Sequence, residues 1–200
     1  PNLCVCSSPE TCDSSTCLGA PLEGVEEVFA CDWSFAVIMS GSRTVKSWGR
    51  ADRGGDSSSV STALNEGGFV TIISAGAAFC AVKSSGTVVC WGYGMASGIT
   101  RTTPYTTIFS NWYAYAGLTV TGKLEAWGGS NSGGITPTIP ADARVVRVFS
   151  SNRAFAALLN DGSLVCWGDQ NNGGECNRNP AVKDQVKSGV RFVAATAYAM

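Results

Sequence analysis

Short apolar runs that alternate with polar turns dominate the chain from residue 24 onward. In the clearest example, an apolar run from Ala154 to Leu159 is followed by the turn Asn160-Asp161-Gly162 and by a second run that ends at Trp167. Asp-Gly between apolar segments predicts a β-hairpin, because glycine readily takes the positive φ that the turn requires. A third short strand is expected before the hairpin, at residues 145–149. No segment keeps a 3.6-residue apolar period, so the pattern predicts no helix longer than about two turns.

This three-strand unit recurs about every 40 residues along the chain. A Trp-Gly pair marks each copy, with spacings of 43, 36 and 40 residues, at Trp48-Gly49, Trp91-Gly92, Trp127-Gly128 and Trp167-Gly168. An aromatic residue lies 12 positions earlier, or 13 in the first copy, whose hairpin has one extra residue, at Phe35, Phe79, Tyr115 and Phe155. A glycine pair follows the tryptophan at Gly54-Gly55, Gly133-Gly134 and Gly173-Gly174, with Ser97-Gly98 in the second copy.

The repeats define the expected domain organisation. Residues 1–23 form a small disulfide-rich leader, and residues 24–200 form tandem repeats at about 24–67, 68–106, 107–144, 145–188 and, in part, 189–200. Small residues beside one large aromatic residue in each hairpin suit close stacking of one copy on the next. The predicted fold is therefore all-β, a β-propeller-like array of four short antiparallel sheets plus a partial fifth.

The combined motif of aromatic-Ala, Asp-Gly, Trp-Gly and Gly-Gly resembles the repeats of the regulator of chromosome condensation superfamily. The resemblance covers residues 24–200, and the short period is closest to that of beta-lactamase inhibitor protein II. It implies a β-propeller that serves as a binding platform, for nucleotide exchange, protein inhibition or scaffolding. The chain departs from the family at one position, just before the first hairpin strand. Family repeats often place histidine there, where this chain has Ser34, Ala78, Ala114, Ala154 and Ala197.

Composition narrows the possible partners. The chain has 14 basic and 15 acidic residues and a formal net charge of -1. With no charge run longer than Glu26-Glu27, nothing favours binding to nucleic acid or to an anionic membrane surface. No apolar stretch reaches the 18 or so residues that a membrane span requires. The start at Pro1 is expected to reflect a processed or excerpted segment of a longer precursor.

Nine cysteines indicate an oxidising compartment and hence an extracellular, secreted protein. Cys80 and Cys90 face each other if the turn between them has three residues, and Cys166 and Cys176 bracket a glycine turn. Cys4, Cys6, Cys12 and Cys17 can pair in three ways, which leaves Cys31 as the odd cysteine. A zinc site is the rival interpretation, but the chain has no histidine and Cys4 and Cys6 are too close for the usual ligand spacing.

Little in the sequence indicates catalysis. Without histidine, a general base would have to be an acid, lysine, tyrosine or cysteine. Asp161 belongs to a hairpin turn and Asp169 follows Trp-Gly, so both have structural explanations. Asp169 with Asn171, Asn172 and Glu175 could form a calcium loop, but the other copies do not repeat this set, which favours a solvated loop. We expect no enzymatic activity, no cofactor and no metal.

Aromatic residues supply the candidate contacts. Trp48, Trp91, Trp127 and Trp167 recur at one repeat position, which favours a core role over sugar binding. Trp33 and Trp112 lie in the polar turn before the first hairpin strand and have no evident packing role, so they are predicted to contact a partner. Phe192 and Tyr198 are further candidates, because they belong to the incomplete fifth copy.

These features favour a non-catalytic extracellular scaffold, a subunit of a larger assembly such as a filament or surface appendage. Its partner would be a protein, through self-association or chain continuation at the carboxyl-terminal edge. The alternative is a soluble binding propeller, either a protein inhibitor or a carbohydrate-binding module. A hydrolase would need acids clustered in the central channel. Thr/Pro stretches at 100–107 and 136–140 leave O-linked glycans open, whereas Asn-x-Ser/Thr does not occur.

Overall fold

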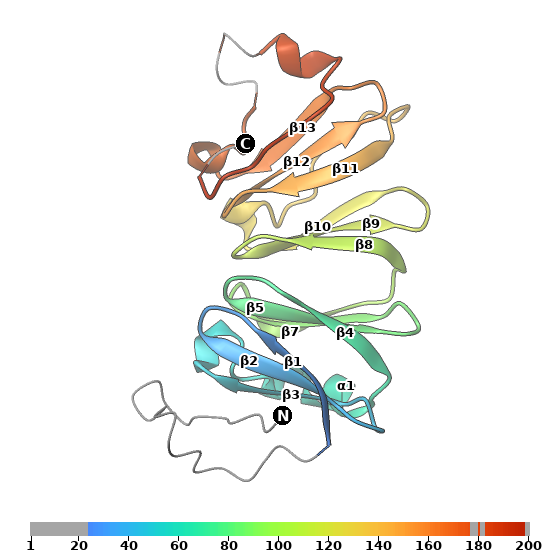
Figure 1. The fold of residues 1–200 in the computed structure, drawn as a ribbon, viewed down its shortest axis with the longest axis vertical. Helices are drawn as coiled ribbons and strands as arrows, with labels where there is room; N and C mark the ends of the chain where they lie inside the picture. Colours follow the sequence, from blue (N-terminus) through green and yellow to red (C-terminus); the bar gives the residue numbers. More distant parts are fainter. Residues whose placement is uncertain (1–23, 177–179, 181–182, 199–200) are drawn as a thin grey trace.

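The computed structural model describes residues 24–176, 180 and 183–198, and in this part of the chain the protein is all-β (Figure 1). Four antiparallel sheets, here called blades 1 to 4, follow one another along the long axis. Blade 1 contains β1 (Val25–Ala30), β2 (Ser34–Met39) and β3 (Val45–Gly49). Blade 2 contains β4 (Phe69–Ser74), β5 (Ala78–Lys83), β6 (Val88–Gly92) and β7 (Met95–Arg101). Blade 3 contains β8 (Tyr105–Ser110), β9 (Ala114–Thr119) and β10 (Leu124–Gly128). Blade 4 contains β11 (Val145–Ser150), β12 (Ala154–Leu159) and β13 (Leu164–Gly168).

The hairpin turns follow the turn chemistry of the sequence. In blade 2, Lys83 N donates to the Thr87 carbonyl across the three-residue turn, in which Gly86 has a φ of 87°. The extra residue of the first hairpin lies between the paired residues Ile38 and Val45. There Arg43 has a φ of 51°, the one positive φ of a non-glycine residue in the described chain.

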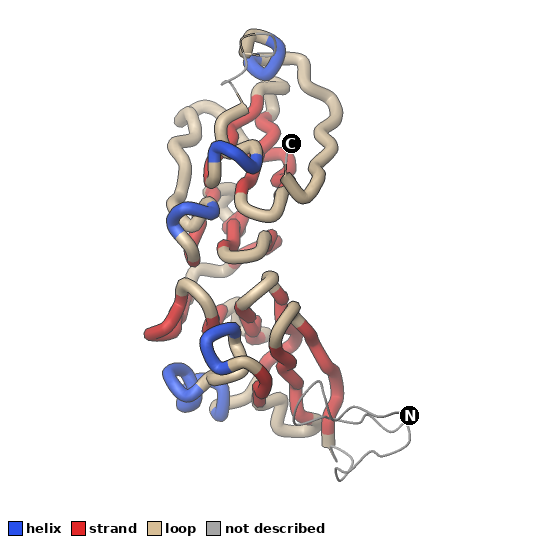
Figure 2. Tube along the Cα trace, turned by 90° about the vertical axis from the view of Figure 1, so that its left-hand side faces the viewer, coloured by secondary structure: helices blue, strands red, loops and turns tan. Residues whose placement is uncertain are grey.

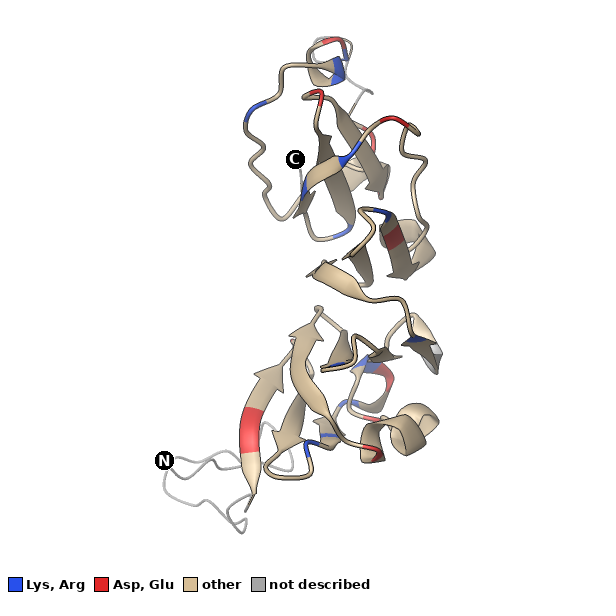
Figure 3. Ribbon diagram, turned by 90° about the vertical axis from the view of Figure 1, so that its right-hand side faces the viewer, with Lys and Arg blue, Asp and Glu red and all other residues tan. Residues whose placement is uncertain are grey.

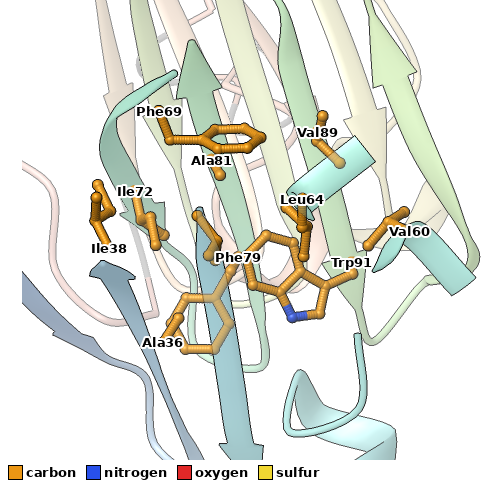
Figure 4. Packing of buried hydrophobic residues seen from close by; sticks show 11 residues of the cluster. Ala36, Ile38, Val60, Leu64, Phe69, Ile72, Phe79, Ala81, Val89 and Trp91 are labelled. Atoms are coloured by element: carbon orange, nitrogen blue, oxygen red, sulfur yellow. The ribbon is translucent and has the colours of Figure 1, made fainter. Parts of the chain in front are cut away.

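Blades stack because each hairpin has two apolar faces. In blade 2, Phe79 and Trp91 pack toward blade 1, while Cys80 and Cys90 lie in the cluster shared with blade 3. Figure 4 shows the first cluster, in which Ala36 of β2 lies near Phe79 and Ile38 lies beside Ile72. The same arrangement recurs between blades 3 and 4, so the core is a series of interfaces between blades.

Three blades end in a short 3-10 turn that carries the glycine pair. These turns are η2 (Ala51–Arg53), η4 (Ser130–Ser132) and η5 (Gln170–Asn172). The residue after each is a left-handed glycine, Gly54, Gly133 or Gly173. At Gly54 and Gly133, packing excludes a side chain in addition to the left-handed φ. A Cβ on Gly54 would lie 2.9 Å from the Phe79 ring, and a Cβ on Gly133 would lie 2.7 Å from the Phe155 ring.

The sequence predicts Ser97-Gly98 as the counterpart of the glycine pair, but the tail of blade 2 differs from those of the other three blades. Instead of a 3-10 turn it has the fourth strand β7, in which Ile99 pairs with Cys90 and Arg101 with Val88. Ser97 stands within β7, at the position where the other blades have the left-handed first glycine. Between blades 1 and 2 lie η3 (Ser58–Val60) and α1 (Ser61–Asn65), with Val60 and Leu64 buried in the blade interface.

The segment 183–198 contains η6 (Gln185–Lys187) and has no assigned strand among its described residues. Residues 189–198 still run beside blade 4, since Val190 N donates to the Gly162 carbonyl and Asn152 N to the Ala197 carbonyl. Trp112 N donates in the same way to the Asn152 carbonyl. Ala197 is therefore equivalent to Asn152, and the sequence alignment that matched Ala197 with Ala154 is wrong by two positions. The leader at 1–23, with its four cysteines, lies outside the described residues.

Candidate interaction surface

The turns between the first and second strands of successive blades line up along one side of the stack. Main-chain hydrogen bonds link neighbouring turns, from Asp32 N to the Gly76 carbonyl at 3.2 Å and from Trp112 N to the Asn152 carbonyl at 3.1 Å. These turns and residues 195–197 line an open groove of about 740 Å³. Asp32 is the one charged side chain in its lining, so the groove presents mainly peptide groups and small polar side chains.

A side chain from each of three turns fixes the glycine-pair turn of its own blade. Asn111 Nδ2 donates to the Ser132 carbonyl at 2.7 Å, and Ser151 Oγ donates to the Asn172 carbonyl at 2.6 Å. In blade 1 the donor to the equivalent Arg53 carbonyl is Ser34 Oγ, at 2.6 Å. Blade 2 has no such turn, and Ala75 stands at the equivalent position. These polar residues therefore have a structural role, that of holding the blade ends in place.

Next to the groove, aromatic and arginine side chains form a continuous row across all four blades. We call it the aromatic-arginine row, and its members are Trp33, Arg53, Tyr93, Tyr113 and Arg153. The Arg53 guanidinium lies 5.2 Å from the Trp33 ring centroid and 4.3 Å from that of Tyr93. The Tyr93 and Tyr113 centroids are 5.0 Å apart, and Arg153 lies 5.0 Å from the Tyr113 ring. The row thus joins residues 120 positions apart in the sequence.

The row keeps polar groups available at its surface. Trp33 and Tyr93 are 39% and 44% exposed. Among the described residues, Trp33 Nε1 and the Tyr93 and Tyr113 hydroxyls have no hydrogen-bond partner in the protein. Arg53 Nε is buried and also lacks one. Its nearest carboxylate oxygen, on Asp52, is 3.5 Å away, while Asp52 accepts a 2.7 Å bond from Arg50.

A second polar cluster lies between blades 2 and 3 and is fully paired internally. Arg101 donates to the Tyr105 hydroxyl and to Glu125, each at 2.6 Å, and the Tyr105 hydroxyl donates to the same Glu125 oxygen at 2.7 Å. The Tyr105 hydrogen bond, followed by that of Arg101, lowers the pKa of Glu125. Burial raises the pKa of Tyr105. Every member of this cluster is therefore paired within the interface between the two blades.

The predicted contact residues fall in different places. Trp33 belongs to the aromatic-arginine row, whereas Trp112, 38% exposed, is one turn position earlier and lines the groove. Trp33 and Trp112 therefore lie in the same kind of turn but at different positions within it. Phe192 and Tyr198 are 80% and 71% exposed and belong to the segment 189–198 that runs beside blade 4.

The sequence predicts one shared core environment for the four repeat tryptophans, but the structure shows that one of them differs. Trp91, Trp127 and Trp167 are buried, with 0%, 3% and 8% exposure. Trp48 is half-buried, and its stacked neighbour Phe35 is exposed. The difference arises because the other three stack on a preceding blade, and blade 1 is the first in the described chain.

The described residues form two disulfides, Cys80–Cys90 and Cys166–Cys176. Cys80 and Cys90 are directly paired across β5 and β6 and completely buried. Cys31 has a free thiol, whose sulfur lies 3.0 Å from Ser34 Oγ. The proposed pairings of Cys4, Cys6, Cys12 and Cys17 concern residues outside the described part of the chain.

The acidic residues considered in the sequence hold turns. Asp161 accepts hydrogen bonds from the Ser163 backbone N and hydroxyl, and Asp169 accepts one from Asn171 N as the cap of η5. The described residues contain no group of three or more potential metal ligands. They also contain no helix long and apolar enough to cross a membrane.

Sequence reasoning missed four of the five residues of the row, namely Arg53, Tyr93, Tyr113 and Arg153. One signal was available. Tyr93 follows Trp91-Gly92 directly, at a position where the other copies have Arg50, Gly129 and Asp169. Tyr93 N donates to the carbonyl of Ala77 at 3.0 Å, and Ala77 is the one small residue at a turn position that holds Trp33, Tyr113 or Arg153 in the other blades.

Comparison with known proteins supports the fold. No protein-family model and no curated protein sequence matches the chain. The entire ectodomain of the receptor kinase CR4 from Physcomitrella patens is 20% identical, with a TM-score of 0.55, over 88% of this chain and 48% of that chain. Yeast RCC1 (Prp20) is 19% identical, with a TM-score of 0.51, over 86% of this chain and 52% of that chain.

A second structure, Prp20p from Saccharomyces cerevisiae, gives 18% identity and the same TM-score of 0.51, with 86% and 53% coverage. The chain therefore spans about half the length of the solved structures that it resembles. Together with the four stacked sheets, these similarities establish an RCC1-like propeller-repeat fold. At this level of identity they carry the fold alone, so function has to be argued from the surfaces described above.

Proposed function

We propose that the protein is a non-catalytic extracellular scaffold that assembles head to tail through the ends of its blade stack. The observation that carries the proposal is the exposed aromatic pair of blade 1. Phe35 is 45% exposed and stacks on Trp48, with ring centroids 5.7 Å apart. The equivalent pairs of the other blades are buried against the preceding blade. An aromatic pair that is built for stacking is therefore available at one end.

The opposite end offers a complementary edge. Residues 189–198 contact blade 4 through two main-chain hydrogen bonds, and Phe192 is 80% exposed. An extended segment with few internal hydrogen bonds can pair with strands of another molecule. Because the two end surfaces differ, contact between them is head-to-tail and can propagate into a filament.

Disulfide usage supports the extracellular part of the proposal. Cys80–Cys90 and Cys166–Cys176 both cross-link residues within one blade or its tail. Such bridges persist in oxidising compartments and are rare in the cytosol. A scaffold exposed outside the cell gains from them, since each bridge restrains the unfolded chain.

Complementary variants test the assembly. Phe35→Asp disables one end and Phe192→Asp the other, so we expect either variant alone to be monomeric by light scattering. An equimolar mixture should form dimers, because each variant retains one intact surface. Ile135→Asp, at an exposed apolar side chain away from both ends, is the matched control and should assemble like the wild type.

Electron microscopy of the wild-type protein provides the second readout, with filaments or chains of particles expected. Wild-type protein that stays monomeric at every accessible concentration contradicts the proposal. The same conclusion follows if the mixture of the two end variants contains no dimer. Either result leaves a soluble binding propeller as the function.

A further inference from the structure

We propose that the aromatic-arginine row binds an acidic peptide segment of a protein partner. This surface runs along the side of the stack, whereas the assembly proposed above uses its two ends. The inference therefore adds a binding activity that does not depend on head-to-tail assembly.

The continuity of the row is the first argument. Each member lies within about 5 Å of the next, from Trp33 in blade 1 to Arg153 in blade 4. The members come from three kinds of position: the first turns supply Trp33, Tyr113 and Arg153, η2 supplies Arg53, and the residue after β6 supplies Tyr93. A row that draws on different positions in different blades is not a by-product of the repeat. It forms a preorganised strip along which an extended peptide can lie.

The chemistry of the free groups is the second argument. The polar groups of the row are an indole N–H, two tyrosine hydroxyls and two guanidinium groups, of which that of Arg153 belongs to the more exposed side chain. Every one of these groups can donate a hydrogen bond. Carboxylates are the acceptors that best match such donors, and hydrogen bonds from guanidinium to carboxylate are among the strongest in proteins. The surface therefore favours a partner rich in acceptors and negative charge.

Charge around Arg53 points the same way. Arg50 holds Asp52 through two hydrogen bonds, at 2.7 and 3.3 Å, while Arg53 Nε remains 3.5 Å from the same carboxylate. Two guanidiniums thus share one carboxylate, which leaves a net positive charge at this point of a chain whose overall charge is -1. Arg153 has only a 3.8 Å contact with Asp169. In Figure 3 most of the ribbon is tan, so charged positions are sparse along the described chain.

The arrangement of the rings favours a peptide over a sugar. A sugar-binding aromatic residue needs a free ring face, but Tyr93 is flanked by Arg53 and Tyr113, and Tyr113 also contacts Trp112 and Arg153. Both tyrosine rings therefore already have neighbours packed against them. Tryptophan, tyrosine and arginine are also the residues that contribute most to binding energy at protein interfaces.

Fluorescence anisotropy with three labelled probes tests the proposal. The probes are a peptide of about ten alternating Glu and Ser residues, the matching Lys and Ser peptide, and an oligogalacturonate of similar charge. Measurements use the Phe35→Asp variant, which is expected to be monomeric, so that self-assembly cannot affect the binding result. We expect the Glu peptide to bind, its affinity to fall with added salt as screening increases, and the Lys peptide not to bind.

Two substitutions and one control localise the site. Arg153→Gln should weaken binding of the Glu peptide about tenfold, and Tyr93→Phe should weaken it several-fold while keeping the ring that contacts Arg53. Arg144→Gln removes an exposed arginine at the other end of blade 4 and should leave binding unchanged. Circular dichroism establishes that each variant is folded.

Three outcomes overturn the proposal: no binding of the Glu peptide, equal losses for Arg153→Gln and Arg144→Gln, or tighter binding of oligogalacturonate than of the Glu peptide. The last result assigns the row to an acidic polysaccharide instead. None of them bears on the assembly test, which reads oligomeric state.

Discussion

The indole Nε1 of Trp91 donates a 2.9 Å hydrogen bond to the carbonyl of Gly54 in the preceding blade. The same contact recurs two blades later, where Trp167 donates to the Gly133 carbonyl at 2.9 Å. Between them Trp127 has no glycine-pair turn to reach, because blade 2 has β7 instead, and its Nε1 lies 3.3 Å from Cys90 Sγ. Across these two blade interfaces, the tryptophan of one copy's Trp-Gly pair thus contacts the Gly-Gly turn of the preceding copy. Viewed from the side, the blades follow one another along the stack (Figure 2).

This pairing predicts unequal costs for one substitution at equivalent positions. Trp91→Phe leaves the buried Gly54 carbonyl without its donor, whereas Trp127→Phe removes only a contact with a weak sulfur acceptor. Loss of volume is the same in both, so Trp91→Phe should lower the free energy of unfolding by about 1–3 kcal/mol more than Trp127→Phe. Urea denaturation measures the difference. Trp167→Phe should behave like Trp91→Phe, and equal losses at all three tryptophans would contradict the prediction.

Cysteine accessibility predicts the order of reduction. Cys80 and Cys90 are completely buried, while Cys166 and Cys176 are half-buried at the end of the stack. Under graded reduction of the folded protein, alkylation should therefore reach Cys166 and Cys176 before Cys80 and Cys90. Without reductant, Cys31 should be the one described cysteine that is labelled. Peptide mass spectrometry assigns the labels, and earlier labelling of Cys80 would overturn this order.

Much of the fold was predictable because its determinants are local. The three-residue turn Ser84-Ser85-Gly86 sets the register of one hairpin, and that register places Cys80 opposite Cys90. The two-residue alternation then fixes which side chains share a face. The recurrence of Trp-Gly indicated how many times this local unit is built.

The candidate site was less predictable because it depends on contacts between blades. Nothing near Arg53 in the sequence indicates that its guanidinium lies between the rings of Trp33 and Tyr93, which are 60 residues apart. The place of Trp33 in a polar turn predicts that it contacts a partner. Which side chains surround its ring depends instead on how one blade packs on the next. The exposure of Phe35 was missed for a related reason, since a repeat motif does not reveal which copy is the first blade of the described residues.

The cluster between blades 2 and 3 predicts a pH dependence of stability. The hydrogen bond from Tyr105, together with Arg101, holds the pKa of Glu125 below its ordinary value of 4.5. A carboxyl group with a lowered folded-state pKa contributes stability that is complete above its unfolded-state pKa and is lost as the pH falls through its folded-state pKa. The free energy of unfolding should therefore drop more steeply below about pH 4.5 in the wild type than in Glu125→Gln. Parallel curves for the two proteins between pH 7 and pH 3 would refute the assignment.

Close packing of Trp112 on the neighbouring turn gives a test of the groove itself. A Cβ added to Gly76 would lie 2.8 Å from two atoms of the Trp112 ring and 3.1 Å from its Cα. Gly76→Ala should therefore destabilise the protein by forcing Trp112 away from the groove, with a cost of about 1–3 kcal/mol. Trp112→Ala removes the ring that would be displaced, so Gly76→Ala should cost much less in that background, and the two substitutions should be strongly non-additive. Urea denaturation of the wild type, both single variants and the double variant measures the coupling. Strict additivity would mean that the glycine serves the backbone of its own turn, and that the groove does not depend on the contact between these two residues.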